Sequence, residues 1–301
     1  MRYNPRARLD RSQIQNRRGG GGGGGLRLPV RGGRGLRVGG GVGGLVILLI
    51  IFFVQAQMGG SSDPSGQDTG GSLAGCTSGA DANRSQDCAL LADVNSIQAF
   101  WTDALPEQAG VRYQPSRTVV FAGQTQTGCG AASADVGPFY CPVDQQVYLD
   151  TSFFRDMLQG QLGARGGQFS WAYVLAHEYG HHVQDLLGTM GKVRTQQGRD
   201  SDAVRLELQA DCYAGIWTKN ATEVDDTRGA PLIENLTRED IARALDAARA
   251  VGDDRIQQRT SGRVNPDQWT HGSAEERMRW FGIGMEQGTL EACDTLAARR
   301  L

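Results

Sequence analysis

The chain has 301 residues, of which 43 are glycine, and a formal net charge of −2 at pH 7. The charge is unevenly divided, because residues 1–40 carry ten arginines against one aspartate while the remainder is acidic. This division excludes a uniformly basic nucleic-acid-binding protein and indicates a basic leader joined to a mildly acidic domain. The residues from about 90 onward contain enough apolar side chains for a sizeable core.

The leader, residues 1–37, is rich in arginine and glycine and includes seven consecutive glycines at 19–25. A segment of this composition buries too little apolar surface to fold, so we expect it to be disordered. RNA or anionic lipid are candidate ligands for its arginines. A positively charged flank beside a membrane span explains the arginines more simply, and we expect no nucleic-acid partner.

An uncharged stretch follows the leader and covers residues 38–62. Residues 38–58 would extend about 31 Å as a helix, which is long enough to cross the hydrocarbon core of a bilayer. Because arginine accumulates on the cytoplasmic side, we expect a single-pass signal anchor with a cytoplasmic N-terminus and an extracytoplasmic domain. A cleaved signal peptide is the alternative, since Val-Gln-Ala at 54–56 has the small residues of a cleavage site.

Residues 59–87, rich in small and polar side chains, predict a flexible linker to a domain at 88–301. All six cysteines follow the uncharged stretch, and their even number beyond a membrane anchor suggests disulfide bonds. Pairing neighbours in the sequence first, and the remaining two by elimination, gives Cys76–Cys88, Cys129–Cys141 and Cys212–Cys293.

Within the domain, apolar periodicity and turn residues predict more helices than strands. The expected helices are 93–105, 170–187, 202–218, one opening at Thr237 and one opening at Ser273, the last two with capping patterns. The expected strands are 118–122 and 146–150. This composition of elements predicts a helix-dominated α+β fold.

The chemistry-bearing motif is His177-Glu178-Tyr179-Gly180-His181, an HExxH sequence on the second expected helix. Two histidines four residues apart share a helix face, so both imidazoles can bind one metal ion. Glu178 lies beside the open coordination position, where it can act as general base. The sequence therefore predicts a catalytic zinc site with two histidine ligands.

A catalytic zinc ion usually has a third protein ligand. The next helix carries Glu207 and Asp211, also four residues apart and surrounded by apolar side chains. Because two buried carboxylates without partners would be costly, we expect Glu207 to complete the ligand set. Asp211 would then accept the free ring N–H of a ligand histidine and fix its orientation.

HExxH followed by ExxxD is similar to the gluzincin pattern, and the chain most closely resembles the bacterial neutral zinc metallopeptidase family. The resemblance covers about residues 129–296. It is carried by GPFYCPVDQQVYLD (137–150), AYVLAHEYGHHVQDLLG (172–188), VRLELQADCYAGIW (204–217), ALDAARAVGDDRIQ (244–257), THGSAEERMRWF (270–281) and Cys293-Asp294-Thr295. The sequence departs from the family pattern at Glu275-Glu276-Arg277, where a more polar stretch is expected, which leaves the role of that block open.

The resemblance implies an extracytoplasmic zincin-like domain, behind one membrane anchor here, with one zinc ion and a peptide or protein substrate. His271 is a candidate catalytic residue that donates to the developing oxyanion, although an ordinary loop histidine is the alternative. By analogy of fold, the VYLD segment at 147–150 would be an edge strand that pairs with the substrate. A non-catalytic, zinc-stabilised envelope binding module is the alternative function.

Overall fold

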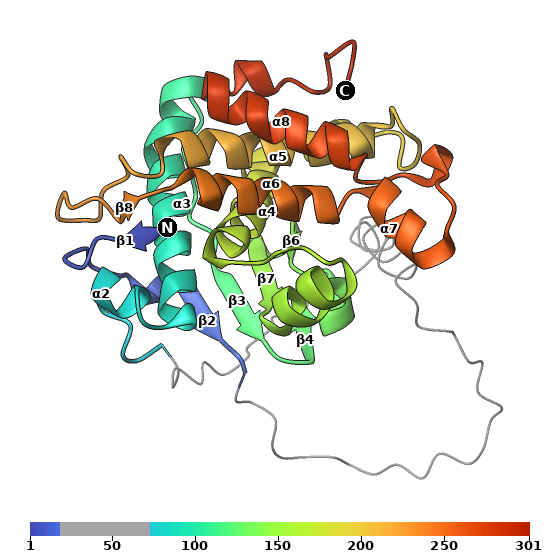
Figure 1. Ribbon diagram of the computed structural model, residues 1–301. Coiled ribbons are helices and arrows are strands. Elements are labelled where there is room, and N and C mark those ends of the chain that lie inside the picture. Colours follow the sequence, from blue (N-terminus) through green and yellow to red (C-terminus); the bar gives the residue numbers. More distant parts are fainter. Residues whose placement is uncertain (19–72) are drawn as a thin grey trace, which may run out of the picture.

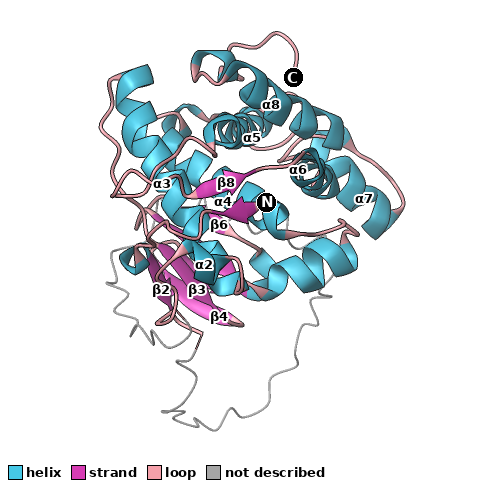
Figure 2. Ribbon diagram, turned by 60° about the vertical axis from the view of Figure 1, so that its left-hand side comes forward, coloured by secondary structure: helices cyan, strands magenta, loops and turns pink. Residues whose placement is uncertain are grey.

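The computed structural model describes residues 1–18 and 73–301, which form a helix-dominated α+β fold (Figures 1 and 2). The helices are α2 (Gly79–Ala82), α3 (Gln86–Ala109), α4 (Gln168–Leu186), α5 (Asp202–Asn220), α6 (Arg238–Ala250), α7 (Asp253–Ser261) and α8 (Ala274–Gln287). A π-helix, Phe154–Gln161, precedes α4. The predicted helices are all present, and α3 is longer at both ends than its apolar spacing indicated.

The main sheet has four strands in the order β2-β3-β7-β6. Its strands are β2 (Ile14–Asn16), β3 (Thr118–Phe121), β7 (Gln146–Asp150) and β6 (Phe139–Cys141). The first three strands are parallel, and β6 is antiparallel to β7. The expectation that the VYLD segment is an edge strand is therefore wrong, because β7 is paired on both sides and β6 forms the edge.

Two smaller antiparallel pairs complete the strand pattern. One joins β4 (Gln124–Thr127) to β5 (Gly130–Ser133), and the other joins β1 (Arg2–Tyr3) to β8 (Ile233–Asn235). The capping patterns expected at Thr237 and Ser273 are confirmed, since both side chains accept from the backbone three residues on. These caps fix the starts of α6 and α8, which are drawn below and above α5 in Figure 1.

The first 18 residues are folded against the domain, so the expected disorder of residues 1–37 is wrong for this part. β2 extends the main sheet beside β3, and β1 lies beside β8 (Figure 1). The Arg18 guanidinium also pairs with Asp87 on α3 at 2.7 Å. The prediction of disorder failed here because it was based on the composition of the whole leader. The low apolar content of that leader does not reveal a short folded segment at its start.

Tyr3 is the main apolar anchor of this N-terminal segment, and its side chain is completely buried. Its hydroxyl donates to the carboxylate of Asp93 on α3 at 2.7 Å. Asn83 holds the Tyr3 backbone on both sides, accepting its N–H and donating to its carbonyl. Residues 73–85, which were expected to belong to a flexible linker, are thus part of the folded unit.

The predicted membrane span, residues 38–58, lies outside the described residues. Among the helices that are described, none has the length and apolar character that crossing a bilayer requires.

All three predicted disulfide pairings are confirmed: Cys76–Cys88, Cys129–Cys141 and Cys212–Cys293. The third ties α5 to the C-terminal segment. Next to this disulfide, α8 and α5 are in close contact. A Cβ atom on Gly284 of α8 would lie only 1.9 Å from the backbone oxygen of Cys212 on α5. Glycine at this position lets α8 pack directly on α5, the helix that carries Glu207 and Asp211.

The docking of the N-terminal segment predicts the cost of truncating Tyr3. Tyr3→Ala should lower the free energy of unfolding by about 3 kcal/mol, because it empties a filled core position and strips a hydrogen bond from Asp93. Arg2→Ala is the matched control, since Arg2 forms only an exposed ion pair with Glu234 worth less than about 1 kcal/mol. Urea unfolding followed by circular dichroism measures the free energy of unfolding of both variants. Equal values for Tyr3→Ala and Arg2→Ala would contradict the packing of the N-terminal segment on the domain.

Candidate active site

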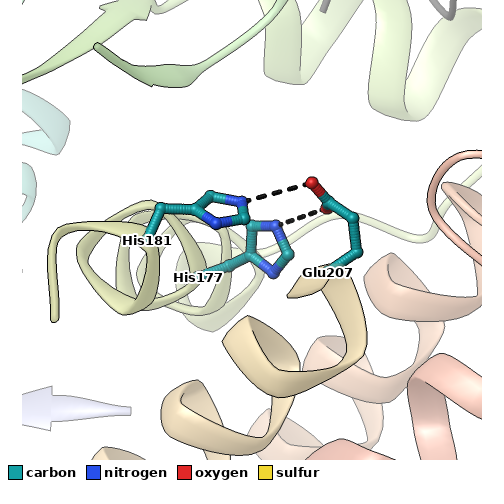
Figure 3. A group of neighbouring side chains, drawn as sticks. All are labelled: His177, His181 and Glu207. Atoms are coloured by element: carbon teal, nitrogen blue, oxygen red, sulfur yellow. Dashed lines mark hydrogen bonds and ion pairs between the residues drawn. The ribbon is translucent and has the colours of Figure 1, made fainter. Parts of the chain in front are cut away.

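Three potential metal ligands converge from two helices (Figure 3). His177 and His181 project from one face of α4, and Glu207 projects toward them from α5. The Nε2 atom of His177 lies 3.2 Å from one carboxylate oxygen of Glu207, and that of His181 lies 3.4 Å from the other. Atoms that bind one zinc ion tetrahedrally at about 2.1 Å are roughly 3.4 Å apart. The observed spacing therefore fits zinc.

The close contact of α4 and α5 makes this convergence possible. Gly180, inside the HExxH motif, faces Ala210 of α5, and a Cβ on Gly180 would lie 3.0 Å from the Ala210 backbone oxygen. Any larger residue would push the helices apart by a few tenths of an ångström or more. The glycine thus sets the distance at which Glu207 reaches both imidazoles.

The structure places Asp211 against His177, and the Asp211 side chain is completely buried. Its Oδ1 atom lies 2.9 Å from His177 Nδ1 and accepts a hydrogen bond from the Tyr173 hydroxyl at 2.5 Å. Arg277 of α8 donates to both oxygens of this carboxylate, at 2.8 and 3.0 Å. With Nδ1 engaged by Asp211, the Nε2 atom of His177 is the one that faces Glu207 and the metal position.

The electrostatics of the site favour a bound cation. Burial raises the pKa of Asp211, but Arg277 and His177 outweigh burial and lower it to about 2. Burial lowers the pKa of His177, but Asp211 and Glu207 outweigh burial and raise it to about 10. Burial likewise raises the pKa of Glu207, and the charges of His181 and His271 outweigh it, so that this pKa is lowered. Two ionised carboxylates thus face the imidazoles, which is the charge environment that a divalent metal requires.

Glu178 lies on the same helix but is not among the three grouped ligands. Its side chain is 7 % exposed, and it makes no hydrogen bond to any residue in the described part of the chain. Burial raises the pKa of this carboxyl group. A carboxylate that is desolvated, unpaired and next to the metal position has the properties of a general base.

His271 is placed at the site, as the sequence suggested. It precedes α8, lines the same cavity as the three ligands, and its Nδ1 atom lies 2.8 Å from the Thr270 hydroxyl. The loop is fixed by Asp253, whose Oδ2 accepts from the backbone N–H groups of residues 270–272. Burial lowers the pKa of His271, but Glu207 and Asp253 outweigh it and raise this pKa.

Two other residues of α4, one inside the motif and one directly after it, make structural contacts. His182 hydrogen bonds through Nδ1 to the Tyr140 hydroxyl and through Nε2 to the Gln114 carbonyl, and so faces away from the ligands. Tyr179 is completely buried and shares a hydrogen bond with Thr118 of β3. Both residues fasten α4 to the rest of the fold.

A cavity of about 180 Å³ adjoins the site and contains Glu178 and all three ligands in its wall. The rest of its lining is mostly apolar and comes from strand β6, the π-helix, α4 and α7. It includes Val136, Phe139, Met157, Leu162, Val174 and Ile256. Such a cavity accommodates an uncharged, apolar group beside the metal position.

Sequence reasoning missed three residues of the site: Tyr173, Gln184 and Arg277. Tyr173 lies one turn before His177 and Gln184 lies about one turn after His181, so helical spacing alone places them on the ligand face. The Gln184 side chain accepts from His181 Nδ1 at 2.8 Å. Nothing local identifies Arg277, which reaches Asp211 from 66 residues further along the chain.

Comparison with known proteins gives a consistent family. Residues 1–296 match the family model described as "Putative neutral zinc metallopeptidase". The uncharacterized protein Rv2575 of Mycobacterium tuberculosis is 51% identical over 231 residues, which are 76% of this chain and 77% of that protein. The uncharacterized protein YpfJ of Escherichia coli K12 is 40% identical over 284 residues, 89% of this chain and 91% of that protein. No solved structure matches.

The buried Asp211–Arg277 pair predicts a large cost for removing one partner. Arg277→Met should lower the free energy of unfolding by about 3–5 kcal/mol, because it leaves the Asp211 charge without its main counter-charge. Arg249→Met on the neighbouring helix α6 is the matched control, since Arg249 is exposed. Urea unfolding of the two variants tests this; a loss no greater than that of the control would show that the ion pair contributes little.

Proposed function

The chain belongs to the neutral zinc metallopeptidase family, and we propose that it is a zinc peptidase that hydrolyses peptide bonds in a peptide or protein substrate. The observation that carries the proposal is the position of Glu178. Its free carboxylate lies beside His177, His181 and Glu207 in the wall of one cavity. A base, a site for one zinc ion and room for a substrate group therefore coincide.

His177, His181 and Glu207 would hold one zinc ion, which when bound would supply a Lewis acid for the scissile carbonyl and for a water molecule. The Glu178 carboxylate accepts a proton from the attacking water and then donates it to the leaving amine nitrogen. His271 donates a hydrogen bond to the carbonyl oxygen as negative charge develops on it. Asp211 keeps the proton of His177 on Nδ1, so that Nε2 stays available as a ligand.

Strand β6 and the cavity lining indicate how a substrate lies. Among the described residues, β6 is the outer strand of the main sheet on the side of the cavity, and its residues Phe139 and Tyr140 form part of the cavity wall. The apolar lining beside the metal position favours a large apolar side chain next to the scissile bond. This lining supports a peptide substrate rather than a small polar one.

The alternative, a non-catalytic zinc-stabilised envelope binding module, fits the geometry less well. A structural zinc site is normally closed by four protein ligands, whereas the group found among the described residues has three. A binding module would also have no use for the unpaired, buried carboxylate of Glu178, which costs stability.

The two carboxylates nearest the metal position should respond differently to substitution. Glu178→Gln should keep zinc and the fold but lose about 10²–10⁴-fold in hydrolysis, because it removes only the base. Glu207→Ala should lose zinc, because it removes a ligand, and activity should fall with it. Metal analysis and digestion of a peptide library measure both effects, and the library also reports the expected preference for large apolar residues.

Glu223→Gln, an exposed position at the end of α5, is the control for the loss of a carboxylate. Zinc loss in Glu178→Gln together with full activity in Glu207→Ala would reverse the assigned roles. Zinc binding without cleavage of any peptide would favour the binding module.

We further infer that the catalytic domain lies outside the cytoplasm, and three disulfides support this location. The expected topology with a cytoplasmic N-terminus conflicts with the strand pairing. β2 and β3 are neighbours at about 4.8 Å, whereas a single crossing would separate them by about 30 Å of hydrocarbon. Residues 1–18 and the domain therefore lie on the same side of the membrane.

This topology predicts that single cysteines at two exposed positions behave alike. Arg6→Cys in the N-terminal segment and Arg263→Cys after α7 should both react with a membrane-impermeant maleimide in intact spheroplasts that express the full chain. Labelling after lysis is the control for each position. Labelling of Arg263→Cys alone would restore the single-pass topology, and labelling of neither before lysis would place the domain in the cytoplasm.

A further inference from the structure

The second histidine ligand is held differently from the first. Asp211 and Arg277 orient His177, but the Nδ1 atom of His181 contacts a neutral amide, Oε1 of Gln184, at 2.8 Å. Gln184 is completely buried. Nothing in the mechanism above uses this glutamine, and its contacts extend well beyond the ligand.

The other end of the Gln184 amide is fixed by two acceptors. Its Nε2 atom donates to the backbone carbonyl of Leu206 at 2.7 Å and to Oε1 of Gln209 at 3.1 Å. Because both of these partners accept, the NH₂ group must face them, and Oε1 must face His181. An oxygen at that position requires the proton of His181 to be on Nδ1, which leaves the Nε2 lone pair directed at the metal position.

Gln209 is fixed in the same way from the far side. Its Nε2 atom donates to the backbone carbonyl of Cys293 at 2.9 Å, so its Oε1 atom is turned toward Gln184. Gln209 is 5 % exposed, and Cys293 is completely buried. The Cys212–Cys293 disulfide holds the carbonyl-bearing residue against α5, the helix on which Gln209 lies.

We propose that Gln184 and Gln209 are positioning residues that set the tautomer and orientation of His181 for zinc, with the disulfide-anchored Cys293 carbonyl as the outer end of the relay. All three hydrogen bonds of the relay run in one direction: the imidazole donates to the Gln184 amide, that amide donates to the Gln209 amide, and the Gln209 amide donates to the Cys293 carbonyl. The relay also couples Glu207 to His181, since the Leu206 carbonyl that Gln184 contacts belongs to the residue before Glu207. The proposal rests on the zinc site of the proposed function, and it does not require peptidase activity.

Zinc affinity, measured by competition with a chelator, tests the relay without any assay of hydrolysis. Gln184→Met should lower affinity about 10–100-fold, the usual effect of losing an outer partner of a histidine ligand. Gln209→Met should lower zinc affinity less, because the hydrogen bond from Gln184 Nε2 to the Leu206 carbonyl remains. Gln168→Met is the matched control, since it makes the same change at the half-buried start of the same helix.

A second substitution separates positioning from general stability. Gln184→Glu retains an acceptor for His181 Nδ1–H but places a charge in the core and removes both donated hydrogen bonds. It should therefore retain most of the zinc affinity while lowering the melting temperature at least as much as Gln184→Met does. A merely structural role would instead make zinc affinity follow the melting temperature in both variants.

The tautomer itself is the most direct readout. In the zinc-bound wild type, ¹⁵N NMR should place the His181 proton on Nδ1, and in Gln184→Met the signal should broaden or shift. A His181 proton on Nε2, or Gln184→Met binding zinc as tightly as Gln168→Met, would overturn the relay. Failure of the wild type to bind zinc would instead overturn the proposed function.

Discussion

The buried carboxylate of Asp211 is the interaction on which the arrangement of the site depends. It lies on α5, contacts His177 and Tyr173 on α4, and pairs with Arg277 on α8, so one charged group joins the three helices around the metal position. A buried carboxylate is tolerated only when its oxygens are satisfied and its charge is balanced, and both conditions hold here. The same contacts that orient the ligand therefore fix the helices that carry it.

The two histidines are supported by different chemistry, and this has a consequence for the metal. Asp211 makes His177 a more electron-rich ligand, whereas the neutral Gln184 orients His181 without adding charge. With Glu207 as the third ligand, the three ligands together carry one negative charge. The Asp211–Arg277 ion pair behind His177 is balanced in charge. A neutral second support avoids adding a fourth carboxylate to Glu178, Glu207 and Asp211, which would oppose the negative charge that develops in the proposed hydrolysis.

The candidate ligands, the candidate base and the helices that carry them follow from the sequence, because spacing along a single helix fixes which side chains share a face. HExxH and the pair Glu207 and Asp211 are both of this kind, and the three disulfides follow from sequence proximity and elimination. Arg277 could not be found in this way, since its contact with Asp211 depends on how α8 packs on α5. The N-terminal segment was missed for a related reason: three residues of β2 carry no periodic signal, and only pairing with β3 makes them a strand.

That short strand also forms one side of the main sheet. A sheet of this order has two edges, and β2 covers the side of β3 that would otherwise present unpaired backbone groups. The other outer strand among the described residues is β6, whose residues line the cavity beside the metal position. The Cys129–Cys141 disulfide joins the end of β6 to the turn between β4 and β5, and so restrains this edge from one end. The cavity wall that β6 forms is thus held by β7 along the strand and by a disulfide at one end, while residues from the start of the chain extend the sheet on its opposite side.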